Sequence, residues 1–444
     1  GGNNRKIASV KADRKPAAIA RLLGRCDDLR RDARAADTAE RIKRLRPRTK
    51  YGKHCHDRSL THISLRDMIY LDNAATGGEK PASVQSAVLA AMKACANPGR
   101  SGHARSLACA RQVIACRELL SELFDGYGAE RVVFTKNCTE ALNIALLGTL
   151  KAGDHVVTTC LEHNSVLRPL AFLKRTKNVS FDVAPLTQGK LLPETIAALV
   201  RPETKLCCVT SASNVTGEAP DLHALRSLLP DRVLLVVDGA QGAGHLPIAM
   251  RKTGIDALAL AGHKGLFAIQ GAGALLFSER FSPESILFGG TGSESYTLDM
   301  PAFYPDRLES GTLSYPAICS LAEGALLVMG RRAEMAQKLL SLTAYFAQEL
   351  EKIAGYRAYF SPNACGIAAF AHEKLPSEEI AQRLSDGFSI AVRGGLHCAP
   401  LAHRALGTFP EGLVRASFSP FQGNDEADAL ADALARIAAG ATSS

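Results

Sequence analysis

The chain has 444 residues, of which 46% are hydrophobic and 22% charged, a composition that suits one large or two ordinary globular domains. No apolar run approaches the roughly 18 residues that span a bilayer and no segment resembles a signal peptide, so we expect neither a membrane protein nor a secreted one. The 12 cysteines show no disulfide framework and no paired CxxC spacing, which favours a reducing, cytoplasmic location.

The first 67 residues form a basic segment. Residues 1–66 hold 19 Lys/Arg and 7 Asp/Glu, a balance of +12, whereas residues 67–444 carry −3. Such a segment could be a nucleic-acid-binding arm or a disordered tail, but it has almost no aromatic residue to stack on a base. Met68 opens "MIYLDNAAT", a sensible protein start, so we interpret residues 1–67 as a dispensable extension and do not expect nucleic acid as a partner. The "HCH" of residues 54–56 lacks a second cluster, and no metal site is predicted.

From residue 68 onward, short apolar runs alternate with amphipathic stretches. The runs typical of buried strands are residues 131–135, 154–159, 205–213, 232–241, 257–264 and 271–277. This order predicts an α/β core with a largely parallel sheet, whose ligand lies beyond the carboxyl ends of the strands. We place a large domain at residues 68–315, whose first residues join the smaller domain. A long helical region over residues 316–354 then opens the small α+β domain at residues 316–444.

Polar residues follow several of these runs. In "TKNCTEALN", Cys138 and Thr139 stand where a strand turns into a helix, so that backbone N–H groups and a hydroxyl face an anion such as phosphate. "LLVVDGAQ" delivers Asp238 and "LALAGHK" delivers Lys264 at the ends of two further strands. Other strand ends supply His163 in "LEHN", Asn214 in "SASNVTG" and Gln241 in "DGAQ".

The same residues also have simpler interpretations. Asp238 beside Lys264 could be a structural pair, and Thr139 could be an ordinary helix cap. Together, however, an anion cradle, a carboxylate, an amine and an imidazole suit pyridoxal 5'-phosphate. Lys264 would form the Schiff base, and Asp238 would keep the pyridine nitrogen protonated so that the ring accepts electrons. His163 could stack on the ring, and Gln241 could donate to its phenolic oxygen.

The chain resembles a known family over residues 69 to about 438. "YLDNAAT", "NPGRSGH", "TEALN", "LEHNS", "SNVTG", "VDGAQ", "GHK", "ESGT", "VRGGLHC" and "VRASFSPFQ" follow the order of class V aminotransferase-fold enzymes. They are most similar to cysteine desulfurases of group II, the SUF-type and selenocysteine lyase-like members. The resemblance implies a fold type I pyridoxal phosphate-dependent transferase, with a mostly parallel seven-stranded sheet and a smaller C-terminal α+β domain. It also implies conversion of L-cysteine to L-alanine, with sulfur passing through an enzyme persulfide to a sulfur-acceptor protein for iron–sulfur clusters or other pathways.

The resemblance assigns roles position by position. Lys264 matches the cofactor-binding lysine, Asp238 the partner of the ring nitrogen, and His163 the stacking histidine. Gln241 and Asn214 match residues around the cofactor's oxygen and the substrate, and Thr139 and His263 match phosphate ligands. Thr312 in "ESGT" matches a threonine that reaches the phosphate of the partner subunit, which implies a homodimer. Arg415 matches the arginine that clamps the substrate carboxylate, with a surface ion pair as the alternative.

The segment "VRGGLHCAPLAH", residues 392–403, holds the candidate nucleophile Cys398. Gly394 and Gly395 permit backbone turns that other residues resist, and Arg393 and His397 supply positive or polarisable groups that could favour a thiolate. The family's R-x-G-x-x-C pattern is met, which implies that Cys398 carries the persulfide. The alternative is a buried structural cysteine.

Two departures and three rival functions stay open. Ala261 stands where the family often has a hydroxyl two positions before the histidine of "GHK", and "GLFAIQGAG" follows the lysine where relatives commonly have Gly-Pro. A selenocysteine lyase acting on L-selenocysteine, or an aminotransferase, would share this fold. The third rival is a nucleic-acid-binding protein on a catalytically silent scaffold, against which the intact Lys264 and Asp238 argue.

Overall fold

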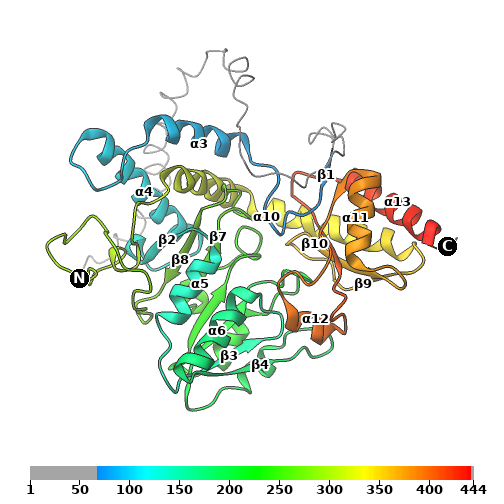
Figure 1. Ribbon diagram of the computed structural model, residues 1–444, viewed down its shortest axis with the longest axis horizontal. Coiled ribbons are helices and arrows are strands. Elements are labelled where there is room, and N and C mark those ends of the chain that lie inside the picture. The colour runs from blue at the N-terminus through cyan, green and yellow to red at the C-terminus, as the bar shows by residue number, and fades with distance from the viewer. Residues whose placement is uncertain (1–67, 442–444) are drawn as a thin grey trace, which may run out of the picture. The chain divides into compact units, whose positions relative to one another are not determined.

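The computed structural model describes residues 68–441. The basic segment 1–67 and its "HCH" therefore lie outside the described residues. Within them, a seven-stranded sheet and two smaller sheets are present (Figure 1). None of the helices of residues 68–441 has both the length and the apolar character needed to cross a membrane.

The large sheet is α/β and mostly parallel, as predicted. Its strands, in spatial order, are β2 (Val132–Thr135), β8 (Gly273–Phe277), β7 (Ala257–Ala261), β6 (Leu234–Asp238), β5 (Thr204–Thr210), β3 (His155–Thr159) and β4 (Ser180–Ala184). Only β8 runs antiparallel to its neighbours β2 and β7. Five of the strands fall within the apolar runs seen in the sequence, β5 begins one residue before its run, and β4 was not predicted.

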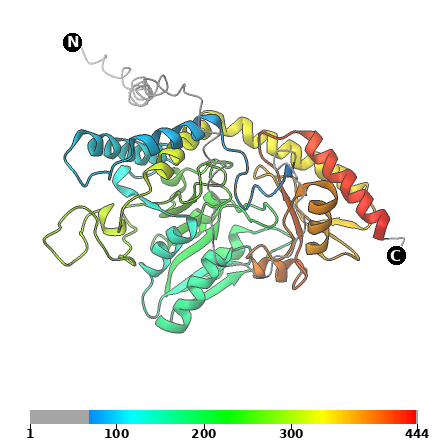
Figure 2. The same cartoon turned by 45° about the horizontal axis from the view of Figure 1, so that its top comes forward.

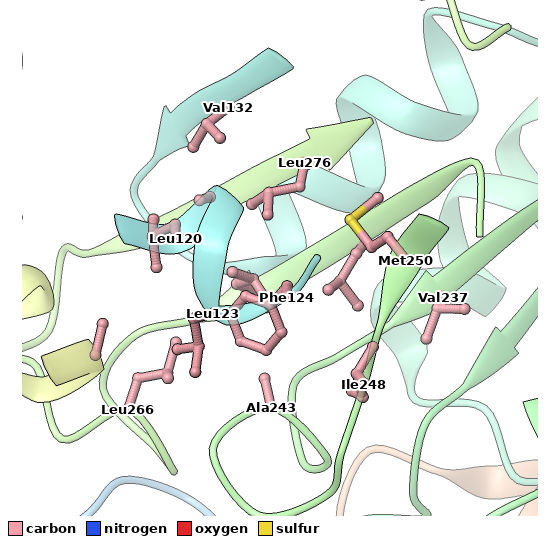
Figure 3. Close-up of a cluster of buried hydrophobic side chains, with 14 of the residues drawn as sticks. Leu120, Leu123, Phe124, Val132, Val237, Ala243, Ile248, Met250, Leu266 and Leu276 are labelled. Atoms are coloured by element: carbon pink, nitrogen blue, oxygen red, sulfur yellow. The ribbon is translucent and has the colours of Figure 1, made fainter. Parts of the chain in front are cut away.

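Helices cover both faces of this sheet. The helices of the described residues are α3 (Ala82–Ala94), α4 (Ala104–Leu123), α5 (Cys138–Leu147), α6 (Asn164–Lys177), α7 (Pro193–Ala197), α8 (Leu222–Leu228), α9 (Met250–Thr253), α10 (Tyr315–Glu351), α11 (Ser377–Phe388), α12 (Pro400–Leu406) and α13 (Asn424–Ala441). Successive residues of a strand point to opposite faces. Leu206 and Cys208 accordingly pack with α5 and α6, whereas Cys207 and Val209 pack with α4 and α8. Figure 3 shows part of the hydrophobic cluster that contains Cys207 and Val209, in the region around Phe124.

The C-terminal part has a sheet of its own. β9 (Tyr356–Ala358), β10 (Ile367–His372) and β12 (Val414–Ser417) form an antiparallel sheet in the order β12-β10-β9. The first strand of the described chain, β1 (Ile69–Tyr70), pairs with β11 (Ile390–Ala391) of this part. The first described residues thus pair with a strand of the C-terminal part.

The helix α10 belongs to both cores. Its first half, from Tyr315 to Met335, packs in the cluster against the large sheet, and its second half, from Leu339 to Leu350, packs in the cluster of the small sheet. Figure 2 shows this helix running from the neighbourhood of α4 to that of α13. The predicted helical region, residues 316–354, therefore forms one helix of 37 residues that connects the two cores.

Candidate active site

Eight of the eleven predicted site residues line one cavity at the carboxyl ends of the parallel strands. They are Cys138, Thr139, His163, Asn214, Asp238, Gln241, His263 and Lys264. The cavity has a volume of about 80 Å³ and is partly open to solvent. The register of the sheet places two of the lining residues side by side, because Thr210 at the end of β5 pairs with Asp238 at the end of β6.

Asp238 is buried and uses one carboxylate oxygen for protein contacts. Its Oδ1 accepts hydrogen bonds from the Cys138 thiol at 3.2 Å and from the Ala240 N–H at 2.8 Å. Burial and the Asp238 carboxylate raise the pKa of Cys138 well above its ordinary value, so this thiol stays a donor. Among residues 68–441, no group donates to Oδ2, which remains for a ring nitrogen that carries a proton.

Lys264 brings an amine to the same cavity. Burial lowers its pKa, Asp238 opposes that effect, and Arg415 and Arg393 add to it. Burial therefore shifts the equilibrium toward the neutral amine, the form that can bond to an aldehyde or accept a proton. The segment after the lysine turns tightly, since the Phe267 N–H donates to the Lys264 carbonyl at 2.9 Å and Phe267 has a φ of +54°.

The N-terminus of α5 faces the cavity. Asn137 caps this helix by accepting from the Glu140 N–H, so the predicted alternative of a Thr139 cap is wrong. The cap leaves the N–H groups of Cys138 and Thr139 without partners inside the helix, a geometry that binds phosphate. The Thr139 hydroxyl lies 2.8 Å from that of Ser165, which also lines the cavity.

The two histidines of the cavity are neutral. Burial lowers the pKa of His163 and of His263 to about 4 each. His163 caps α6 through Nδ1, which accepts from the Ser165 N–H at 3.0 Å, and this bond fixes the imidazole at the cavity wall. His263 Nδ1 lies 3.1 Å from the Thr76 hydroxyl. These groups fit pyridoxal phosphate. They are the neutral ring of His163, the Asp238 carboxylate with one oxygen unbonded, the Lys264 amine and the N-terminus of α5.

Gln241 uses one of its amide donors within the protein. Its Nε2 donates to the Ala74 carbonyl at 3.0 Å, and its bond to the cofactor's phenolic oxygen stays a prediction. An amide NH₂ has two protons, so one donor is left for that oxygen. The sequence prediction omitted Thr210 and Ser165, although both line the cavity. Ser165 had a signal, because it directly follows "EHN" at a strand-to-helix turn.

Arg415 lies on β12 beside the cavity and is fully buried. Its guanidinium donates to Asp72 Oδ1 at 2.7 Å and to the Asn214 carbonyl at 3.0 Å. Its Nε and the side-chain oxygen of Asn214 are buried without hydrogen-bond partners among residues 68–441. Because unpaired buried polar atoms are rare, an unused guanidinium donor is a good indication of a ligand carboxylate. The surface ion pair considered for Arg415 is excluded by its burial.

Cys398 sits in a turn that is hydrogen-bonded to Asn214, which lines the cavity, and to Asn164. Its carbonyl accepts from the Asn164 N–H at 2.7 Å, next to His163, and the His397 carbonyl accepts from Asn214 Nδ2 at 2.8 Å. Cys398 is partly exposed, unlike most cysteines of the described residues. Burial, with Arg415 and Arg393, lowers the pKa of His397 to about 2. Of the two positive or polarisable groups expected here, His397 is therefore neutral, and Arg393 is the cation of this segment.

Thr312 does not reach the cavity of its own subunit. It is exposed in the loop before α10 and takes no part in the lining. Its role at a partner's phosphate stays a prediction.

Comparisons with known proteins agree with this geometry. Residues 69–430 match the family model Aminotransferase class-V. A probable cysteine desulfurase of Methanothermobacter thermautotrophicus is 31% identical over 388 residues, which cover 84% of this chain and 96% of the relative. Cysteine desulfurase CsdA of Escherichia coli is 28% identical over 384 residues, or 83% and 93% of the two chains.

Solved structures agree as well. The apo structure of cysteine desulfurase from Thermococcus onnurineus NA1 has a TM-score of 0.78 and 29% identity, and the match covers 84% of this chain and 96% of that one. The crystal structure of E. coli CsdA in its S-sulfonic acid form has a TM-score of 0.76 and 26% identity, over 84% and 95%. Together with the motifs, these matches show that the chain belongs to the class V aminotransferase family, in its cysteine desulfurase branch.

Proposed function

We propose that the protein is a pyridoxal phosphate-dependent cysteine desulfurase that converts L-cysteine to L-alanine and leaves a persulfide on Cys398. The observation that carries this proposal is the position of the Cys398 turn. It is hydrogen-bonded to Asn164 and to Asn214, and Asn214 lines the cavity that also contains Lys264 and Asp238.

The cavity offers one residue for each part of the cofactor. Lys264 would bond to its aldehyde, Asp238 Oδ2 would face its ring nitrogen, and the His163 imidazole would stack on its ring. The N–H groups at the start of α5 and the Thr139 hydroxyl would hold its phosphate. When bound, pyridoxal phosphate supplies an electron sink that makes the substrate's Cα proton acidic.

The chain's own residues then orient the amino acid and move its proton. The unused Nε of Arg415 donates to the substrate carboxylate, beside the donors already engaged by Asp72 and Asn214. The Lys264 amine, whose pKa is lowered by burial, accepts the Cα proton.

Cys398 performs the sulfur transfer. Its thiolate attacks the substrate sulfur, an S–S bond forms, and the C–S bond breaks with its electron pair moving to the carbon fragment. That fragment takes up protons and leaves as alanine, so that one cysteine and one thiol give one alanine and one persulfide. A thiol of an acceptor protein would then remove the outer sulfur and restore Cys398.

We also propose that the active form is a homodimer. Large apolar side chains are exposed on α3, where Leu89 and Met92 are 61% and 63% accessible, and in the loop before α10, where Tyr296 is 89% accessible. Such a surface is typical of a protein interface. Mixing Lys264→Ala with Thr312→Ala subunits tests this proposal, because one site of each mixed dimer would be intact. No recovery of activity over either variant alone would contradict it.

The desulfurase proposal is tested with purified protein, pyridoxal phosphate and L-cysteine. Alanine and sulfide should form with the wild type and with Cys95→Ala, a control at an exposed cysteine. Cys398→Ala should lose sulfide release, and Lys264→Ala should lose alanine formation as well. Undiminished sulfide release by Cys398→Ala would refute the persulfide role, and full activity without Lys264 would refute the cofactor role.

A further inference from the structure

The turn that carries Cys398 is held at two consecutive carbonyl groups. Asn214 Nδ2 donates to the His397 carbonyl at 2.8 Å, and the Asn164 N–H donates to the Cys398 carbonyl at 2.7 Å. Asn214 lies in the loop after β5, and Asn164 is the first residue of α6, which follows β3, whereas the turn lies between β11 and α12. The two bonds therefore join the backbone of the nucleophile to the cavity wall.

The backbone of this turn needs such support. His397 and Cys398 have φ values of +50° and +56°, a left-handed conformation that residues other than glycine adopt rarely. Conformations of this kind persist only where the surroundings hold them. The His397 ring is buried, lies 5.8 Å from the His403 ring, and places Nε2 3.2 Å from the Arg393 carbonyl. Ring packing on one side and the two carbonyl bonds on the other hold the turn.

Asn214 contacts the turn and the substrate arginine at the same time. Its side chain donates to His397, and its backbone carbonyl accepts from Arg415 at 3.0 Å. Its side-chain oxygen has no hydrogen-bond partner among residues 68–441. Within those residues, the Asn214 side chain therefore makes one hydrogen bond, to the His397 carbonyl. One buried residue therefore links the group that would hold the substrate to the segment that would attack it.

We propose that the Asn214 side chain and the Asn164 N–H are positioning groups. They hold the Cys398 turn where its thiol can reach the sulfur of a substrate bound to Arg415, an inference that rests on the proposed function. Sulfur transfer requires the thiolate close to and in line with the substrate sulfur. A displacement of about 1 Å can reduce the rate of such a step by about 100-fold. The reacting atoms are not touched by these two bonds, which act through the backbone of Cys398.

Two variants remove the bonds separately. Asn214→Ala deletes the side-chain donor. Asn164→Pro deletes the backbone donor, and proline suits this position because Asn164 is the first residue of α6. The preceding residue, His163, already has the extended ψ of 156° that a following proline requires. Asn164→Ala changes the same side chain but keeps the N–H, so it is the matched control for Asn164→Pro.

The first measurement does not depend on catalysis. The rate at which iodoacetamide modifies Cys398 is followed by mass spectrometry of its peptide, with no amino acid present. Release of the turn exposes the thiol, so Asn214→Ala and Asn164→Pro should react at least about threefold faster than Asn164→Ala.

The second measurement compares two reactions of the same loaded enzyme. Chloride leaves β-chloro-L-alanine without attack by a thiolate, whereas sulfur release from L-cysteine needs Cys398. The ratio of sulfur release to chloride release should fall about tenfold or more in Asn164→Pro and Asn214→Ala. A purely structural or cofactor-binding role would reduce both reactions together and leave the ratio unchanged.

The inference is overturned if Asn164→Pro reacts with iodoacetamide at the same rate as Asn164→Ala. It is also overturned if the ratio of sulfur release to chloride release is unchanged in both Asn164→Pro and Asn214→Ala. Should Asn214→Ala fail to fold, the Asn164 pair decides alone. A wild-type enzyme that releases no sulfur from L-cysteine would refute the proposed function, and the alkylation rates would still decide whether the two bonds hold the turn.

Discussion

Arg415 is a buried cation with an incomplete set of partners. Asp72 and the Asn214 carbonyl engage its terminal nitrogens, and Nε is left unpaired. The Asp72 carboxylate offsets the cost of burying the charge, and the free donor points to a second anion. At the scale of single residues, this arrangement distinguishes an arginine that serves a ligand from one that serves only the fold.

Replacement of Arg415 by lysine should weaken use of L-cysteine. A lysine keeps the charge but lacks the planar fork and its Nε donor. We expect kcat/KM to fall roughly 10- to 100-fold, since a hydrogen bond to a charged group contributes about 1.5–3 kcal/mol. Steady-state kinetics measure the effect, with the exposed Arg357→Lys as control. Equal kcat/KM values for the two variants would show that Arg415 does not bind the substrate.

Glu162 is a fully buried carboxyl directly before His163. Its Oε1 accepts from the Thr159 hydroxyl at 2.6 Å and the Thr210 N–H at 2.9 Å, so it joins the ends of β3 and β5. Burial raises its pKa to about 8, against hydrogen bonds that lower it. The protonated, neutral form is therefore the one that the fold accepts.

The stability of the protein should carry a pH signature of Glu162. Between about pH 4.5 and 8 the unfolded chain loses this proton and the folded chain keeps it, so the free energy of unfolding falls as pH rises and levels off above pH 8. Glu162→Gln cannot ionise and should lack this fall, which amounts to a few kcal/mol at about 1.4 kcal/mol per pKa unit. Urea unfolding at pH 5 and pH 8 measures it. The prediction fails if both proteins lose the same free energy.

At the scale of elements, the base of the Cys398 turn depends on close backbone approach. A Cβ atom on Gly412 would lie 2.4 Å from the carbonyl carbon of Gly395, and Gly412 has a φ of +73°. Gly395 and Leu413 exchange two backbone hydrogen bonds at this point. Glycine is therefore required at position 412 for two reasons. A Cβ atom would collide with the Gly395 backbone, and the positive φ disfavours other residues.

A pair of glycine substitutions separates these two requirements. Gly407 has a φ of +70°, but its Cβ would meet no atom within 4 Å. Gly407→Ala should cost about 1–2 kcal/mol for the left-handed backbone alone. Gly412→Ala should cost a further 1–3 kcal/mol or so from overpacking. Chemical denaturation compares them, and similar losses would mean that the turn yields easily to the extra methyl group.

The strands show what local sequence can and cannot predict. Runs such as "LLVVD" are apolar on both faces because helices cover both faces, and the sequence therefore identifies them. The edge strand β4 is mostly half-buried and mixes Ser180 and Asp182 with apolar residues, so it resembled a loop. Strand-end residues such as Asp238 and Lys264 were predictable because topology brings strand ends together. The neutral charge of His397 was not, because it depends on burial by segments distant in sequence.

At the scale of the whole molecule, a buried ion pair ties the loop before α10 to the sheet. Arg117 of α4 donates to both carboxylate oxygens of Glu309, at 2.8 and 2.6 Å, and Glu309 also accepts from the Phe134 N–H of β2. Burial raises the pKa of Glu309, and Arg117 opposes that rise. The pair anchors the chain three residues before Thr312.

Loss of Glu309 should destabilise the protein strongly. Glu309→Ala leaves the Arg117 guanidinium buried without its charged partner, which typically costs about 3–5 kcal/mol. Glu334→Ala breaks an exposed pair with Arg331 and should have little effect. Thermal and urea unfolding of both variants measure the difference. Equal stability of the two would show that the buried pair contributes no more than a surface one.

The pairing of β1 with β11 and of Asp72 with Arg415 has a consequence for synthesis. A ribosome that has produced the chain to about residue 390 has released Lys264, Asp238 and the whole seven-stranded sheet, but neither Cys398 nor Arg415. The growing chain can therefore build the cofactor cavity while it still lacks Arg415 and Cys398, which we propose bind the substrate carboxylate and accept its sulfur. In the proposed mechanism, sulfur transfer becomes possible only after the chain beyond residue 390 has joined β1 and Asp72.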